Sequence, residues 1–90
     1  MEQMEVFTAE TVKIWLEIQN MEIIKLRDDY IKLGQAIKAA NLVGSGVEAK
    51  FVIQDGLVKV NGQVELQRGK KLVDGDIVEF EGYTIKIEKW

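Results

Sequence analysis

The chain has 90 residues and a formal net charge of −3, with 47% hydrophobic and 30% charged residues. This composition is typical of one small globular domain and excludes a wholly disordered chain. Cysteine and histidine are both absent, so disulfides and thiolate metal sites are excluded and the commonest general base of enzymes is missing. We therefore expect a protein that is not an enzyme and that has no catalytic residues, no metal site and no cofactor.

Two features of the sequence predict a cytoplasmic location and no membrane partner. No apolar run approaches the roughly 18 residues that a membrane-spanning helix needs. Glu2 and Glu5 precede any apolar segment, and their charge is opposite to that at the start of a secretory signal.

Charge is segregated along the chain. Residues 1–20 contain four glutamates and one lysine, and residues 72–90 contain five acidic and two basic residues. Residues 32–71 contain seven basic and three acidic residues. Such segregation creates a local positive field that the net charge of the whole chain conceals.

The first half of the chain predicts two helices with a strand between them. Residues 8–20 have the apolar pattern of a helix, which Thr8 can cap. Residues 21–26 change to a strand pattern, and Asp28 and Asp29 then favour the start of a second helix. Its apolar residues recur at helical spacing up to about residue 41, and they are Tyr30, Leu33, Ile37 and Ala40.

The next helix has the sharpest start signal in the sequence. Ser45 and Glu48 form a capping box, in which each side chain accepts a hydrogen bond from a backbone N–H of the first turn. The helix is expected to run to about Gln54 and to stop at Gly56, with Ala49, Val52 and Ile53 on one face. A tight link at Val43-Gly44 requires this helix to pack against the preceding one.

After Gly56 the apolar pattern has a period of two, which is typical of strands. Val58 and Val60 are followed by Asn61-Gly62, a hairpin signal. The apolar pattern favours a loop one residue longer than a two-residue turn, with Val60 opposite Val64. A turn at 74–76 precedes a strand at 77–80, and a turn at 81–82 separates it from a strand at 83–87. The order of helix, strand, two helices and then several strands predicts the α+β class.

One set of residues between positions 33 and 82 carries a family resemblance. In chain order it comprises Leu33-Gly34-Gln35, Lys38, Ser45-Gly46, Glu48-Ala49-Lys50, the stretch 56–62, the stretch 68–72 and Asp74-Gly75-Asp76. This set resembles the S4 RNA-binding superfamily, and most of all its small stand-alone bacterial members of the YaaA/YbcJ type. The resemblance implies an S4-type (αL motif) domain at 21–90, with two packed helices against a small, mostly antiparallel sheet. Residues 1–20 would be an N-terminal extension that adds a helix.

The resemblance also implies that a basic face of the two helices and the following loop binds structured RNA. The expected RNA is ribosomal, in ribosome assembly or translation, and the protein is expected to be a monomer without a small-molecule substrate. The N–H groups at the start of the helix at Gly46 favour a phosphate, and the 68–71 cluster can lie along a nucleic-acid backbone. The expected RNA-binding residues are Lys38, Ser45, Gly46, Lys50, Lys59, Asn61, Arg68, Lys70 and Lys71.

Parts of the sequence also have features of two other functional classes. A protein-interaction adaptor could use the acidic N-terminal helix or the acidic C-terminal strands. A ubiquitin-like sulfur carrier would end in Gly-Gly, whereas this sequence ends in Glu88-Lys89-Trp90. For the aromatic residues, core packing is preferred over base stacking at Phe51, and Trp15 and Tyr30 are expected to be buried or semi-buried.

Overall fold

The computed structural model describes residues 9–12 and 20–90. Within the helix predicted over 8–20, residues 9–12 are helical and Asn20 lies in a turn. The rest of that prediction, including Trp15, lies outside the described residues. Within 9–12 and 20–90, no helix is long and apolar enough to cross a membrane.

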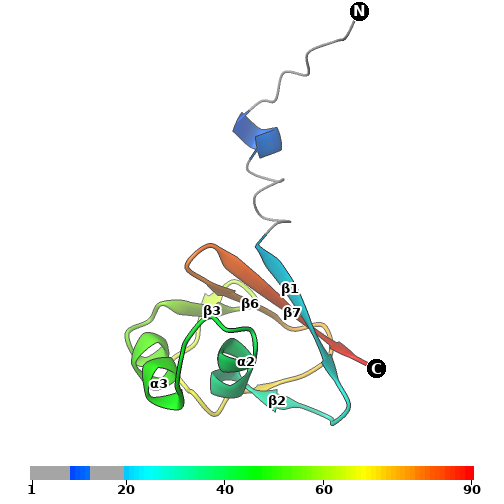
Figure 1. Ribbon diagram of the computed structural model, residues 1–90, viewed down its shortest axis with the longest axis vertical. Helices are drawn as coiled ribbons and strands as arrows, with labels where there is room; N and C mark the ends of the chain where they lie inside the picture. The colour runs from blue at the N-terminus through cyan, green and yellow to red at the C-terminus, as the bar shows by residue number, and fades with distance from the viewer. Residues whose placement is uncertain (1–8, 13–19) are drawn as a thin grey trace, which may run out of the picture.

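Two strands, two consecutive helices and five further strands follow one another along residues 21–89, and this segregation of helices and strands confirms the α+β class (Figure 1). Two short helices are present between residues 33 and 54, namely α2 (Leu33–Ala39) and α3 (Gly46–Gln54). The strands are β1 (Met21–Leu26), β2 (Ile31–Lys32), β3 (Val58–Val60), β4 (Gln63–Val64), β5 (Lys71–Leu72), β6 (Ile77–Phe80) and β7 (Tyr83–Lys89).

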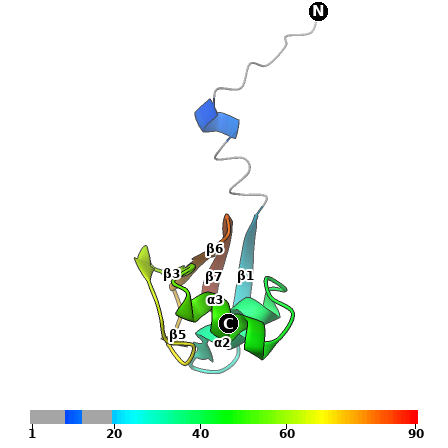
Figure 2. The same ribbon diagram turned by 90° about the vertical axis from the view of Figure 1, so that its left-hand side faces the viewer.

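Five strands form the main sheet in the order β1-β7-β6-β3-β4, and β2 and β5 form a separate antiparallel pair. Only β1 and β7 are parallel within the main sheet. Helices α2 and α3 pack on each other and cover one face of the sheet, as the two views show (Figures 1 and 2). This is the predicted arrangement of two packed helices against a small, mostly antiparallel sheet.

The core lies between the helices and the covered face of the sheet. Alternate strand residues point into it because successive side chains of a strand lie on opposite faces. The fully buried large side chains are Leu33, Ile37, Ile53, Leu72, Ile85, Ile87, Val58 and Val78. Burying such side chains stabilises the fold by about 1.5–3 kcal/mol each before the loss of chain entropy is counted.

The prediction that α2 starts at Asp28 and Asp29 is wrong, because the helix begins at Leu33. Ile31 and Lys32 instead pair with Leu72 and Lys71 in the two-stranded sheet. Extended backbone at these positions prevents a helix from starting earlier. Tyr30 therefore precedes the helix and is 42% exposed, contrary to the expected burial.

The capping box at the start of α3 is only half formed. Ser45 Oγ accepts a hydrogen bond from Glu48 N at 3.1 Å, as predicted. The Glu48 carboxylate accepts from Gly44 N at 3.0 Å rather than from the cap residue itself. The helix nevertheless ends at Gln54, and Gly56 has the positive φ of 77° that its role as a stop requires.

The predicted register between β3 and β4 is wrong. Asn61 and Gly62 have φ values of 51° and 83°, so they form a two-residue turn. Val60 consequently lies opposite Gln63, and Val64 lies opposite Lys59, 52% exposed. The turn geometry outweighs the tendency to bury one valine.

Candidate nucleic-acid interface

A groove about 360 Å³ in volume separates α2 from the start of α3 and the loop before β5. Its lining consists of Lys32, Gly34, Gln35, Lys38, Gly46, Ala49, Arg68 and Gly69. Three of these residues are cations, three are glycines, of which Gly46 and Gly69 are exposed, and none is acidic. A basic groove with accessible backbone suits a polyanion because it combines charge with close approach.

The loop of residues 68–70, called the basic loop below, is attached to α2 by backbone hydrogen bonds. Leu33 N donates to Lys70 O at 2.8 Å, and Gly34 N donates to Arg68 O at 3.0 Å. These carbonyls satisfy N–H groups of the first helical turn that otherwise have no partner within a helix. The loop that carries Arg68 is thereby held at a fixed place beside the helix.

Gly34 permits the close approach of the Arg68 side chain. A Cβ atom at this position would lie 2.6 Å from Arg68 Cγ and 3.2 Å from Arg68 Cδ. The aliphatic part of Arg68 therefore lies directly on the helix backbone, and its position fixes where the guanidinium group can reach. A guanidinium group can bind a phosphate with two donors.

Gly46 opens the other side of the groove. It is the first residue of α3, and a Cβ there would meet no atom within 4 Å. Backbone N–H groups of the first turn are consequently accessible beside Lys38 and Arg68. The electrostatic effect of this helix end is reduced by Glu48, whose carboxylate lies at Gly44 N in the same turn.

The structure brings Lys38, Gly46 and Arg68 of the predicted RNA-binding residues together in the groove. Ser45 is adjacent as the cap of α3, and its oxygen is engaged in that role. Lys50 lies one turn after Gly46 on the exposed side of the helix, outside the groove lining.

Three other predicted residues lie elsewhere. Lys59 projects from the uncovered face of the sheet, because its neighbours in β3 point into the core and it lies opposite Glu79. The Asn61 side chain donates to Asp76 Oδ1 and accepts from Ile77 N, both at 2.9 Å. Lys71 lies beside Lys32 in the two-stranded sheet, with its Nζ 4.8 Å from the centre of the Tyr30 ring.

Lys70 is exposed in the loop, next to the groove residues Arg68 and Gly69. Lys32 and Gln35 were missed as groove residues. Because α2 was expected to start near residue 28, Lys32 was placed inside the helix instead of at its cap. The correct helix start would have indicated that Lys32 and Gln35 lie at the same end as the basic loop.

Phe51 does not pack in the core, contrary to the preferred prediction, and is 60% exposed. It shares the outer side of α3 with Val47 and Lys50, opposite the buried Ala49 and Ile53.

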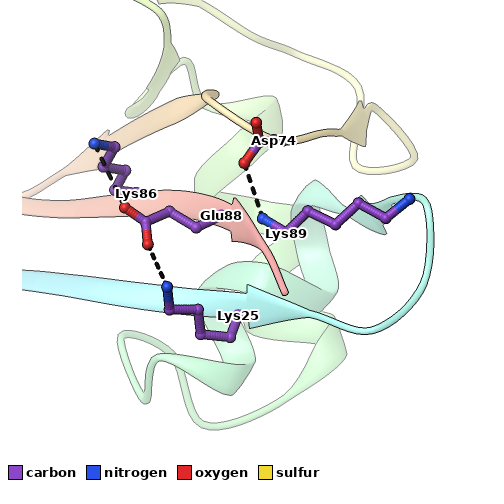
Figure 3. A network of polar contacts seen from close by, with 5 residues as sticks. All are labelled: Lys25, Asp74, Lys86, Glu88 and Lys89. Atoms are coloured by element: carbon purple, nitrogen blue, oxygen red, sulfur yellow. Dashed lines mark hydrogen bonds and ion pairs between the residues drawn. The ribbon is translucent and has the colours of Figure 1, made fainter.

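The lysines near the C-terminus differ from those of the groove in being paired. Glu88 accepts a hydrogen bond from Lys25 Nζ at 2.6 Å, and its other oxygen lies 3.5 Å from Lys86 Nζ (Figure 3). The hydrogen bond and charge of Lys25 hold the pKa of Glu88 below its ordinary value. Within 9–12 and 20–90, Lys32, Lys38 and Arg68 form no ion pair. Their charges are therefore available to a ligand.

Asp74 and Asp76 have structural roles. Asp74 Oδ1 accepts from Lys89 N at 2.9 Å (Figure 3), and Asp76 Oδ2 accepts from Val73 N at 2.8 Å. Among the residues that the structure describes, no group of three or more acidic residues could hold a metal ion.

Comparison with known proteins agrees with the fold. Residues 24–88 match the family model of the S4 domain. The "Probable ribosome maturation protein RlbA" of Bacillus subtilis (strain 168) is 40% identical over 60 residues, which cover 67% of this chain and 84% of that protein. The "Putative RNA-binding protein YbcJ" of Escherichia coli (strain K12) is 34% identical over 58 residues, which cover 64% of this chain and 83% of that protein. The chain therefore belongs to the S4 domain family.

Proposed function

We propose that this protein binds structured RNA without catalysis, and that the groove between α2, α3 and the Arg68 loop is its binding site. The observation that carries the proposal is the composition of the groove, which has three unpaired cations, three glycines and no acidic residue. Lysine and arginine contacts to phosphates supply most of the affinity in such complexes. The names of the relatives RlbA and YbcJ support RNA as the partner.

The RNA that we propose is ribosomal RNA. The protein would bind it as a monomer, in the cytoplasm, during ribosome maturation. The name of the Bacillus subtilis relative supports this choice. The groove has no base-reading constellation of paired amides and carboxylates, because Gln35 is its one side-chain amide. Recognition would therefore depend on the shape of the RNA and the positions of its phosphates.

Crosslinking in cells tests both parts of this proposal. The protein is crosslinked to RNA, purified under denaturing conditions, and the attached RNA is sequenced. We expect reads concentrated at a few rRNA positions, and we expect the Lys38→Gln/Arg68→Gln variant to lose them. Lys59→Gln is the control outside the groove, since it removes a positive charge from the uncovered sheet face.

Attached RNA without rRNA enrichment would contradict the ribosomal assignment. Absence of attached RNA, together with no retention of the pure protein on an RNA column at low salt, would contradict RNA binding and favour the adaptor function.

A further inference from the structure

A second hollow adjoins the groove at the turn between β1 and α2. Its lining consists of Arg27, Asp28, Asp29, Tyr30, Lys32 and Gln35. Lys32 and Gln35 line both hollows, so the two are contiguous. A polymer held in the groove therefore has the second hollow next to it, on the other side of Lys32 and Gln35.

The side chain of Tyr30 is an exposed ring on a fixed support. The next two residues are held by pairing with β5, and Tyr30 itself contributes nothing to the buried core. Lys71 Nζ lies 4.8 Å from the centre of the ring, and Tyr30 is nevertheless 42% exposed. An exposed aromatic ring beside a cation is the usual platform for an unpaired base.

The carboxylates of the hollow favour a base over a run of phosphates. Asp29 is paired with Lys89 at 3.0 Å, whereas Asp28 has no partner within 9–12 and 20–90. A free carboxylate repels a phosphate, but it accepts hydrogen bonds from the exocyclic amino group of a base. The groove has no acid, so the two hollows differ in the part of a nucleotide that each can take.

Arg27 gives the hollow a cation at its rim. Its guanidinium carbon lies 6.0 Å from the centre of the Trp90 ring, and Trp90 N donates to Leu26 O at 3.0 Å. The backbone bond and the ring contact together hold Arg27 beside the end of β1. There it can neutralise the phosphate that flanks a base stacked on Tyr30.

We propose that this hollow binds an unpaired nucleotide of the RNA that the groove holds, with its base stacked on Tyr30. The inference rests on the proposed function and adds a substrate class to it, namely structured RNA with a single-stranded extension. The acceptor at Asp28 favours bases with an amino group, such as adenine and cytosine.

Binding of the full chain to three forms of one RNA hairpin tests the inference. The first form has a blunt end, the second has an unpaired oligoadenosine tail, and the third has a tail of abasic riboses with the same phosphates. We expect the adenosine tail to tighten binding by about tenfold, the effect typical of one stacked base, and the abasic tail to give no comparable gain.

Three variants identify the ring that is responsible. Tyr30→Ala should abolish the gain from the adenosine tail and leave the affinity for the blunt hairpin unchanged, whereas Tyr30→Phe should keep the gain. Tyr83→Ala removes the other tyrosine, which is the first residue of β7 and is 45% exposed, and it should also keep the gain.

The outcomes separate this inference from the function on which it rests. Binding of the blunt hairpin with no gain from the adenosine tail would overturn the stacking site alone. An equal gain from the abasic tail would do the same, because it would assign the effect to phosphates. Failure of all three hairpins and of rRNA fragments to bind would overturn the proposed function and the stacking site together.

Discussion

Replacing Gly34 by alanine should weaken the contact between α2 and the basic loop. The new Cβ would lie 2.6 Å from Arg68 Cγ, and real Cβ atoms essentially never come this close to another heavy atom. Overpacking of this kind costs about 1–3 kcal/mol, while the better helix propensity of alanine returns about 1 kcal/mol. We expect a net loss of roughly 1 kcal/mol, which lowers the Tm of a domain of this size by about 4–8 °C.

Gly46→Ala is the control for this prediction. A Cβ at Gly46 meets nothing within 4 Å, so alanine should stabilise the fold by about 0.4–1 kcal/mol. Thermal unfolding followed by circular dichroism measures both variants, and binding of an RNA hairpin then reports on Arg68. The reasoning would be refuted if Gly34→Ala raised the Tm as much as Gly46→Ala and left RNA affinity unchanged.

Three further predictions concern parts of the chain outside the groove. Asn61→Ala removes two side-chain hydrogen bonds of the β3–β4 turn and should lower the free energy of unfolding in urea by about 1–3 kcal/mol, with no change in RNA affinity. A larger loss of binding free energy than of unfolding free energy would contradict this. The lowered pKa of Glu88 stabilises the fold above about pH 4.5, and this stability is lost as the pH falls through the pKa of the folded state. Glu88→Gln should therefore show a flatter dependence of Tm on acid pH than the wild type. Parallel curves for the two proteins would contradict the role of Lys25. Removal of residues 1–19 should leave a cooperatively melting domain, because among the described residues the buried core cluster and both sheets lie within 20–90. A molten product in circular dichroism would show that the extension is part of the fold.

Local signals were sufficient to predict the elements that they start or stop. Ser45 and Gly56 bound α3 within a residue of the prediction, and the turn at Glu81-Gly82 separates β6 from β7 as expected. These features depend on backbone conformations and hydrogen bonds between near neighbours, so the sequence contains them directly.

The features that were missed depend on residues far apart in the chain. Pairing of Ile31 with Leu72 moves the start of α2, and neither two-residue strand has a periodic pattern of its own. The groove depends on the same pairing, because it places Lys32 beside the loop of Arg68. Nothing in the local sequence indicates that the carbonyls of that loop would cap the helix.

Two wrong placements could have been avoided from spacing alone. Val58 and Val60 alternate with Lys59, so burial of the valines directs Lys59 away from the helices by the period of a strand. Ala49 and Ile53 share one face of the predicted helix, so burial of that face puts Phe51 on the outside by the period of a helix. At both positions the place of the side chain in its element decides its exposure more than its type does.

The salt dependence of RNA binding tests the central claim most directly. If Lys32, Lys38 and Arg68 each contact a phosphate, the logarithm of the binding constant should fall with the logarithm of salt concentration with a slope of about −2 to −3. Lys38→Gln/Arg68→Gln should flatten that slope by about 1.4–1.8 and weaken binding, whereas Lys59→Gln should leave both unchanged. The same slope in wild type, the groove variant and the control would contradict a defined binding groove.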